Sequence, residues 1–280
     1  MSRHDSAPEA ERDEELTNAA NWRAVTLIQV DVDDLPSSIA SGAVPGDRIW
    51  IEATKHGQVV GVVEARAGNE RVPASVLKEL LGSFSDAKVS SYDTVPDELL
   101  PKASVVVPTI CQNPAQLLRT VNALLQLNYP DFEILIVDNR AGRPGPPFPE
   151  FPDDERVQLL SEPMRGISAA RNRGVAASSG EFVAFTDDDA VVDPDRLRAL
   201  GARFVTEPEV GVIGGLVLPL ELDTEPQLWF EEFYGGFSQS FQAETLSIEA
   251  QKGKDPMFSY ASTTRRNSAP PSSSCTSSVP

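Results

Sequence analysis

The sequence predicts an α/β fold in which a mostly parallel sheet, with helices on both faces, follows a small β-rich module. From residue 103 onward, short apolar runs of strand type alternate with amphipathic helical segments, a pattern typical of parallel sheets covered on both faces. Before residue 92, β-type runs follow one another with a single helical segment among them. The 280 residues, of which 40% are hydrophobic, suffice for one large domain or two modest ones.

The N-terminal module, residues 21–91, is predicted from three β-type runs and one helix. The runs are residues 23–30, 47–53 and 58–64. Lys55-His56-Gly57, between the last two runs, is typical of a hairpin turn. A helix is expected over residues 72–84, because Pro73 lies near its start and apolar residues recur at helical spacing after it. No residue pattern in this module indicates chemistry.

The second domain, residues 103–261, carries the alternating pattern. Strands are expected at residues 103–108, 132–137, 157–160, 182–186 and 210–218, and helices at residues 113–127, 168–177 and 195–206. Asn113 and Pro114 suit the cap and the first turn of the first of these helices. Residues 141–154 are rich in Pro and Gly and are expected to form a loop.

The remaining segments are predicted to be a linker and two tails. Residues 92–102, with Pro96 and Pro101, are expected to link the two domains. Residues 1–20 are polar and charged, and residues 262–280 are rich in Ser, Thr and Pro. Both tails contain too few core-forming side chains to offset the entropy of ordering, so both are expected to be disordered.

Charge and composition disfavour several classes of function. The net charge of -18 disfavours nucleic acid and anionic membranes as partners. No segment approaches the ~20 apolar residues of a transmembrane segment, and no apolar signal peptide is evident, so a cytoplasmic location is expected. His4 and His56, the only histidines, lie apart from other ligand types, which disfavours a zinc site. Cys111 and Cys275 lie in different contexts, so no disulfide is expected, and Cys111 is interpreted as buried.

The run from Phe182 to Ala190 carries the strongest chemical signal. A strand of mostly apolar residues leads directly into three carboxylates, Asp187-Asp188-Asp189. Adjacent like charges raise one another's pKa or recruit a cation, and a divalent metal that also holds a phosphorylated ligand would neutralise them. The basic, glycine-punctuated stretch at residues 163–174 could face the same anion. The pattern therefore indicates an enzyme that handles a metal-bound diphosphate.

Polar residues also follow two other predicted strands. Thr109, Asp138 and the three acids all fall at the carboxyl ends of strands. Ligands of open parallel sheets gather outside these ends, so the three positions are expected to converge on one crevice.

The ordered set of these motifs resembles a family 2 glycosyltransferase with the GT-A fold, a Rossmann-like nucleotide-binding sheet. The matching segments, in chain order, are Val105-Val106-Val107-Pro108-Thr109, Ile136-Val137-Asp138-Asn139, the stretch from Arg165 to Gly174, Thr186-Asp187-Asp188-Asp189-Ala190, and Val192-Asp193-Pro194-Asp195 with Leu197. The three acids resemble the DXD motif of that family.

The resemblance implies a metal-dependent, inverting transfer of sugar from a nucleoside diphosphate sugar to an acceptor hydroxyl on a glycan, a lipid or a small molecule. Mg²⁺ or Mn²⁺ would offset the charge that develops on the departing diphosphate. Asp189 is then the expected direct metal ligand, with Asp187 at the ribose or at a metal-bound water. The implied donor-binding residues are Pro108, Thr109, Asp138, Arg165, Arg171, Asp187 and Asp188. Strand alternation directs Asp188 away from its two neighbours, and Arg173 is interpreted as a solvated helix residue.

The chain departs from the family pattern after Gly236. Inverting members carry a catalytic acid of a Glu-Asp pair beyond the metal motif, and no such segment follows here. Glu231 and Glu232 are interpreted as the exposed side of an amphipathic helix, so the catalytic base is unknown. We expect the donor-binding half without the acceptor half, little transfer, and exposed apolar surface around residues 212–220 and 229–237.

Two alternatives to an active transferase remain open from the sequence. The first is a non-catalytic module that binds a nucleotide sugar, which measured turnover would separate from an enzyme. The second is a nucleotidyltransferase, which the absence of glycine between Ile110 and Gln116 disfavours. A dinucleotide-dependent dehydrogenase is disfavoured further, because no GxGxxG follows any strand.

Overall fold

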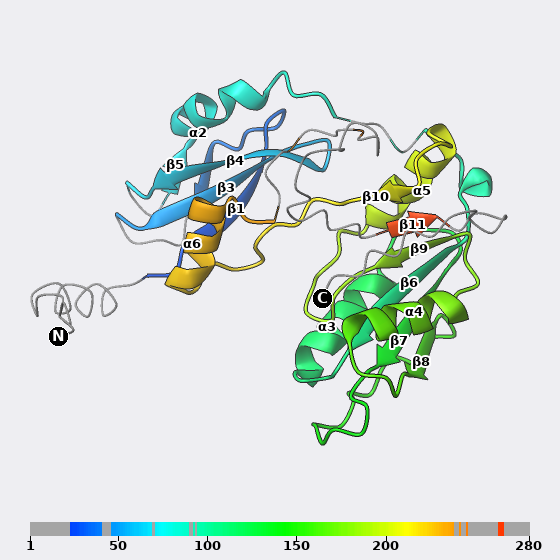
Figure 1. Cartoon of the computed structure of the whole chain (residues 1–280). Helices are drawn as coiled ribbons and strands as arrows, with labels where there is room; N and C mark the ends of the chain where they lie inside the picture. The colour runs from blue at the N-terminus through cyan, green and yellow to red at the C-terminus, as the bar shows by residue number, and fades with distance from the viewer. Residues whose placement is uncertain are drawn as a thin grey trace, which may run out of the picture. The chain divides into compact units, whose positions relative to one another are not determined.

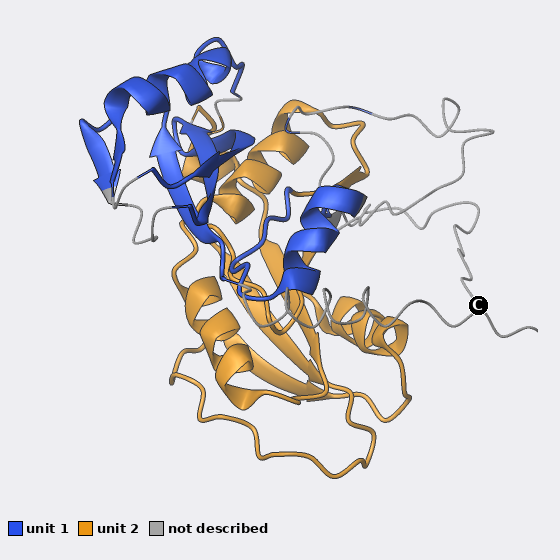
Figure 2. Cartoon of the chain, turned by 90° about the vertical axis from the view of Figure 1, so that its left-hand side faces the viewer, with its two compact units in different colours: residues 1–90, 216–252 blue, residues 91–215, 253–280 orange. Residues whose placement is uncertain are grey.

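The computed structural model describes residues 23–40, 46–68, 71–89, 92, 94–237, 241, 245 and 263–265. It divides into two compact units, which Figure 2 shows in blue and orange. Unit 1 comprises residues 1–90 and 216–252, and unit 2 comprises residues 91–215 and 253–280. This division differs from the sequence-based boundary at 103–261, because residues 216–252 group with the N-terminal module.

The predicted tails lie almost wholly outside the described residues. Residues 1–20 are not among them, and of residues 262–280 only Thr263–Arg265 are described, as a short strand, β11.

Unit 1 is built on a three-stranded sheet of order β1-β3-β4, with strands Thr26–Asp31, Arg48–Lys55 and Gln58–Arg66. Strand β1 runs parallel to β3, and β4 runs antiparallel to β3. The predicted hairpin turn is confirmed, and both of its central residues have positive φ, 49° at His56 and 76° at Gly57. A second pair, β2 (Ser38–Ala40) and β5 (Arg71–Pro73), leads into helix α2 (Ala74–Leu81) and the 3-10 turn η1 (Gly82–Phe84).

Helix α6 (Glu225–Tyr234) belongs to unit 1, although it follows the α/β region in the chain. Leu222 and Leu228 form a buried cluster with Val25 of the N-terminal segment. Arg48 of β3 pairs with both Glu64 of β4 and Glu232 of α6. Sequence segments about 200 residues apart therefore share one small core.

The two glutamates on α6 differ in exposure. Glu232 is exposed, as expected, and pairs with Arg48, whereas Glu231 is only half-exposed. The reason is that Gly235, at φ 74°, ends the helix and turns Gly236 back against the Glu231 carboxylate. Burial accordingly raises the pKa of Glu231.

Unit 2 confirms the predicted α/β architecture (Figure 1). Strands β9 (Phe182–Phe185), β6 (Ala103–Thr109), β7 (Phe132–Asp138) and β8 (Val157–Ser161) lie side by side in that order and run parallel. Helices α3 (Pro114–Leu125), α4 (Ile167–Ala177) and α5 (Arg196–Thr206) connect or follow these strands. Strand β11 extends the sheet antiparallel to β9, and β10 (Val212–Ile213) pairs with β11.

Alternation along the central strands assigns the helices to opposite faces of the sheet. Val105 and Val107 point into the larger core, together with residues of α3 and α5. Val106 and Val137 point the other way, into the cluster beneath α4. Helix α4 approaches closely because of Gly174, where a Cβ atom would lie 2.4 Å from Val106 Cγ1.

One sequence prediction around unit 2 needs correction. The strand expected at residues 210–218 is reduced to Val212–Ile213, which pairs antiparallel with β11, and Leu216 and Val217 beyond it are exposed. The segment at residues 92–102, expected as a linker, packs against the rest of unit 2. Val95 and Leu100 are buried in the main core, and Asp97 accepts a 2.6 Å hydrogen bond from Arg198 of α5. A 3-10 turn, η2 (Asp97–Leu99), spans this segment.

The expected exposed apolar surface is confirmed. The exposed large side chains include Val212, Leu216, Val217 and Leu220 in the first stretch and Trp229, Phe233 and Phe237 in the second. Among the described helices, none is long and apolar enough to cross a membrane.

Candidate active site at the carboxyl ends of three parallel strands

The carboxyl ends of β6, β7 and β9 bring the predicted site residues together. Thr109 ends β6 and Asp138 ends β7, and the two are direct partners in the parallel ladder. The three acids begin two residues after β9 ends at Phe185, and β9 pairs with the other side of β6. Pro108, the other residue predicted here, is buried in β6.

Asp188, the middle acid, is turned into the protein. Thr109 Oγ1 donates a hydrogen bond to its carboxylate and accepts one from the backbone N–H of Cys111 at 2.8 Å. Cys111 is fully buried, as expected, and its φ of 50° turns this N–H toward Thr109. Burial raises the pKa of the Asp188 carboxyl, against the hydrogen bond from Thr109, and the adjacent acid charges raise it further.

The two outer acids face solvent. Asp189 is exposed, and the Asp187 side chain is 57% exposed. Arg171 of α4 reaches Asp187 Oδ1 with Nη2 at 3.3 Å, and its guanidinium lies 5.8 Å from the centroid of the Phe185 ring. Arg196 of α5 is half-buried, and burial lowers the pKa of its guanidinium, while the charge of Asp187 opposes that shift. Two arginines from different helices therefore flank one acid.

The donor atoms at this edge fit a hard divalent cation. Exposed carboxylate oxygens are what Mg²⁺ and Mn²⁺ prefer, and Mg²⁺ sites commonly use one or two carboxylates plus substrate phosphates and water. Within the described ranges, no cluster of three or more His, Cys, Asp or Glu is arranged to hold a metal by itself. Arg171 Nε is buried without a hydrogen-bond partner in the described part of the chain. These residues thus fit an open site that an anionic ligand completes.

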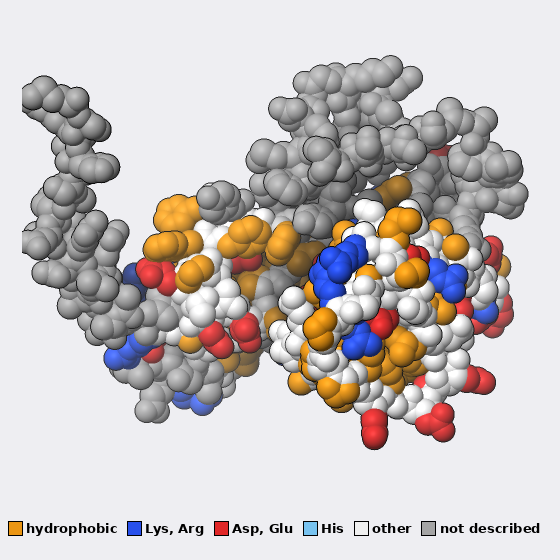
Figure 3. All heavy atoms as spheres, turned by 60° about the horizontal axis from the view of Figure 1, so that its bottom comes forward, with side chains coloured by type: hydrophobic (Ala, Val, Ile, Leu, Met, Phe, Trp, Pro, Cys, Tyr) orange, Lys and Arg blue, Asp and Glu red, His pale blue; other side chains and the backbone are white. Residues whose placement is uncertain are grey.

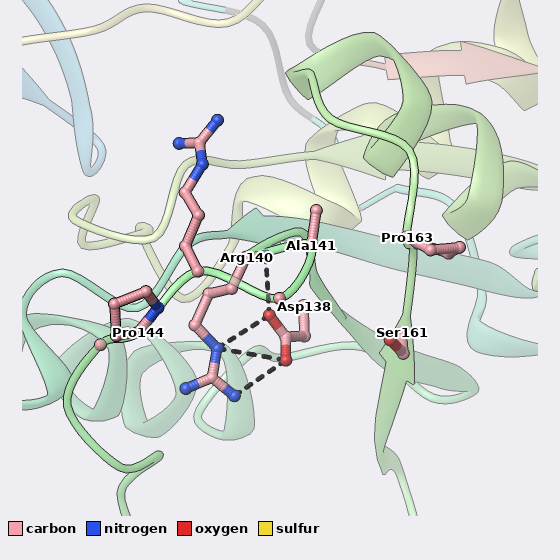
Figure 4. A pocket seen from close by; sticks show the side chains of 9 residues that line it. Asp138, Arg140, Ala141, Pro144, Ser161 and Pro163 are labelled. Carbon is pink, nitrogen blue, oxygen red and sulfur yellow. Dashed lines mark hydrogen bonds and ion pairs between the residues drawn. The ribbon is translucent and has the colours of Figure 1, made fainter.

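Asp138 faces an open pocket of about 780 Å³ at the carboxyl ends of β7 and β8. Arg140 donates from Nε at 3.0 Å and from Nη2 at 2.9 Å to the two oxygens of Asp138, and Figure 4 shows these contacts. The hydrogen bonds from Arg140 hold the pKa of Asp138 below its usual range. The same guanidinium lies 4.2 Å from the centroid of the Phe148 ring. Arg143 and Ser161 also line the pocket.

Asn139 organises the segment that leads into α4. Its buried side chain donates from Nδ2 to the carbonyl oxygens of Glu162 at 3.1 Å and Met164 at 2.6 Å. Its Oδ1 accepts the N–H of Gly166 at 2.9 Å. Gly166 has a φ of 122°, which favours glycine and lets the chain turn into the helix. Arg165, next to it, is exposed at this end of the unit.

The local charge contrasts with the net charge of -18. In Figure 3, Lys and Arg side chains gather in several groups on unit 2, while Asp and Glu side chains lie mostly toward its margin. Two arginines, Arg140 and Arg143, follow the carboxyl end of β7. Two others follow the carboxyl end of β8, Arg165 before α4 and Arg171 within it. Of the two arginines predicted to bind the donor, Arg171 lies beside Asp187 and Arg165 is exposed. Arg173 is exposed, as expected.

The sequence did not indicate a role for three residues of this site. The pairing of Arg140 with Asp138 could have been predicted, because a spacing of two residues lets an arginine side chain hydrogen-bond to an acid. Asn139 and Thr120 carry no such local signal. Thr120 of α3 bonds to the acid segment 68 and 70 residues further along the chain.

Comparison with known proteins places these elements in a family. The model of glycosyl transferase family 2 matches residues 104–253. A glucosyl-dolichyl phosphate glucuronosyltransferase of Haloferax volcanii is 32% identical over 136 residues, which cover 48% of this chain and 44% of that protein. The succinoglycan biosynthesis protein ExoW of Rhizobium meliloti is 31% identical over 103 residues, covering 34% of this chain and 32% of its own. The match spans less than half the length of these relatives.

Solved structures show more distant likeness. A mannosyltransferase of Pyrobaculum calidifontis, in complex with GDP-Man and Mn²⁺, covers 52% of this chain and 43% of its own, with 20% identity and a TM-score of 0.37. S. aureus TarS 1-349 in complex with UDP-GlcNAc covers 42% and 37%, with 20% identity and a TM-score of 0.31. The family assignment therefore depends on the sequence match, which includes both Asp138 and the three acids. By that match, over more than half of its length, the chain belongs to glycosyl transferase family 2.

Proposed function

We propose that this chain binds a nucleoside diphosphate sugar at the carboxyl ends of β6, β7 and β9 and transfers its sugar to a hydroxyl of a glycan, a lipid or a small molecule. The observation that carries the proposal is the split arrangement of the acid cluster. Asp187 and Asp189 face solvent beside an arginine, while Asp188 between them is turned toward Thr109. Family membership supports the transferase chemistry.

The nucleoside and the diphosphate of the donor are each assigned to different residues along this edge of the sheet. The pocket at Asp138 is large enough for a nucleoside and offers carboxylate and guanidinium groups for hydrogen bonds to it. Arg165 and Arg171 suit the diphosphate, because a guanidinium matches phosphate geometry. Pro108 and Thr109 end the central strand between these parts. A donor contact by Asp188 stays a prediction, since its carboxylate is engaged with Thr109.

Asp189 is the proposed direct ligand of Mg²⁺ or Mn²⁺, with Asp187 at the ribose or at a metal-bound water. When bound, the cation offsets the negative charge that develops on the departing diphosphate. Arg171 holds the Asp187 side chain at the edge of the site and places its own charge beside the same anion. The exposed carboxylates of Asp187 and Asp189 are compatible with these two roles.

The proposed transfer is a single in-line displacement with inversion, as the family resemblance implies. A base must take the proton of the acceptor hydroxyl, and such a base contributes typically ~10²–10⁴-fold. No residue is assigned as that base, and Glu232 is paired with Arg48.

Calorimetry tests the donor site directly. The diphosphates of uridine, guanosine, adenosine and thymidine are titrated into the protein with and without Mn²⁺. We expect at least one to bind more tightly with the metal, and Asp189→Asn to lose this metal-dependent gain. Asp131→Asn is the matched control, because Asp131 is an exposed acid just before β7, at the opposite end of the same sheet.

Equal affinity with and without Mn²⁺ for every diphosphate would overturn the proposal. So would an Asp189→Asn variant that keeps the full metal-dependent gain. Loss of binding in Asp131→Asn as well would indicate a general defect rather than a donor site.

A further inference from the structure

Thr120 occupies an unusual place for a hydroxyl. It lies in the middle of α3 and is fully buried among Leu117, Val121 and Leu124, which are core residues. A buried hydroxyl is costly unless it finds a hydrogen-bond partner, and a threonine within a helix commonly bonds to the carbonyl of its own preceding turn. Valine has nearly the same shape and would fill this position without that cost.

The hydroxyl of Thr120 instead contacts the acid segment. Its Oγ1 lies 3.0 Å from the carbonyl oxygen of Asp188 and 2.9 Å from that of Ala190. A hydroxyl carries one hydrogen, so the two carbonyls share it. The turn has only a weak closure of its own, since the Ala190 N–H lies 3.4 Å from the Asp187 carbonyl oxygen.

Asp188 is therefore held at two points from two different elements. Thr109, at the end of β6, holds its carboxylate, and Thr120, on α3, holds its carbonyl. Asp188 and Asp189 are the central residues of this turn, and Asp187 and Asp189 are exposed on it. Holding Asp188 at both groups fixes the turn and so keeps the two outer acids where a ligand can reach them.

We propose that Thr120 is a positioning residue that sets the orientation of the two outer acids and thereby the affinity of the site for a metal-bound diphosphate. The proposal depends on the function proposed above. Thr120 itself touches neither ligand, and its effect passes through the backbone of Asp188 and Ala190. Groups that orient metal ligands in this way typically change metal affinity 10–100-fold when removed.

The test uses three variants of the full chain. Thr120→Val removes the hydroxyl and keeps the shape, and Thr120→Ser restores the hydroxyl. Thr206→Val is the control for loss of a helical threonine hydroxyl away from the site, because the exposed Thr206 bonds to the Ala202 carbonyl at 3.0 Å within α5. Affinity for the tightest-binding diphosphate is measured with and without Mn²⁺, and urea unfolding reports the stability of each metal-free variant.

We expect Thr120→Val to lower the metal-dependent affinity about 10–100-fold, Thr120→Ser to recover most of it, and Thr206→Val to leave it unchanged. An affinity in Thr120→Val equal to that of the wild type would overturn the inference alone, with the proposed function intact. An equal loss in Thr206→Val would overturn it too, because the loss would then follow general destabilisation. A wild-type chain without metal-dependent binding would overturn the proposed function and this inference together.

Discussion

The two ends of the parallel sheet in unit 2 use the same chemical group in opposite ways. At the amino end, Glu133 of β7 is only 8% exposed and accepts hydrogen bonds from Ser104 Oγ at 2.6 Å and from the N–H and Oγ of Ser179 at 2.6 and 2.8 Å. At the carboxyl end, Asp187 and Asp189 are exposed. A carboxylate at one end joins strands, and carboxylates at the other end are left for a ligand.

The pKa of Glu133 reflects its structural role. Burial by itself raises the pKa of this carboxyl, but the hydrogen bonds from Ser104 and Ser179, with the nearby charge of Lys102, lower it below its usual value. A buried carboxylate that stays charged has found enough donors, so this end of the sheet is satisfied. The comparison shows that the end of the sheet at which an acid lies matters more than its presence. An acid at the amino end stabilises the fold, and acids at the carboxyl end are open to a ligand.

The largest effect on stability is expected when the satisfied end is broken. Glu133→Ala leaves the hydroxyl of Ser104 and the N–H of Ser179 without their acceptor, and hydrogen bonds to a charged group are worth about 1.5–3 kcal/mol. We expect the free energy of unfolding, measured in urea, to fall by that amount. Asp131→Asn, at the same end but exposed, should change it by less than about 0.5 kcal/mol. A similar loss in both variants would remove the distinction between a buried and an exposed acid at this end.

How much of this comparison the sequence could reveal depends on distance along the chain. The strands, their carboxyl ends and the positions of Thr109, Asp138 and the three acids follow from local periodicity, which each segment carries by itself. The paired faces of the sheet also follow, because side chains alternate along a strand.

The interactions that hold the site in shape leave no such local trace. Thr120 and Asn139 each donate a hydrogen bond to backbone carbonyl groups of a distant segment. Every residue has a backbone carbonyl, so the identity of the accepting residue gives no sign of such a contact. For the same reason, the sequence did not indicate that α6 packs with the N-terminal sheet. At residues 210–218 the apolar pattern suited a strand, but Leu216 and Val217 are exposed, since a strand also needs a neighbour and a face to cover.

The converse change at the ligand end should affect binding and spare stability. Asp187→Asn keeps the shape of an exposed side chain and removes its charge, so the free energy of unfolding should change by less than about 0.5 kcal/mol. The metal-dependent affinity for a nucleoside diphosphate should fall about 10-fold or more, which corresponds to about 1.4 kcal/mol. Calorimetry and urea unfolding on the same preparation separate the two effects. A destabilised variant that binds normally would reverse the roles assigned to the two ends.

The acid dependence of stability isolates the contribution of Glu133. Its folded pKa lies below the ordinary value of 4.5, so its contribution is present above about pH 4.5 and is lost as the pH falls through the folded pKa. Glu133→Gln lacks this titration. The difference in unfolding free energy between wild type and Glu133→Gln should therefore shrink as the pH is lowered below about 4.5. A difference that stays constant or grows with acid would show that Glu133 is not the charged, satisfied group described here.

The smallest expected effect concerns backbone strain, which also differs between the two ends. In the described part of unit 2, the non-glycine residues with positive φ are Cys111 and Ala141, and both follow strands at the ligand end. Ala141, at φ 53°, lies in the loop that lines the Asp138 pocket. Such strain is retained where the surrounding structure needs it, often at functional sites.

Ala141→Gly should therefore stabilise the chain, by up to about 1 kcal/mol, because glycine adopts positive φ without the clash of a Cβ atom. The matched variant is Ala176→Gly, on the exposed side of α4, where the same substitution should destabilise by about 0.5–1 kcal/mol. Urea unfolding of both variants measures the sign directly. If both substitutions destabilise, Ala141 is not strained, and positive φ at the ligand end does not by itself indicate strain.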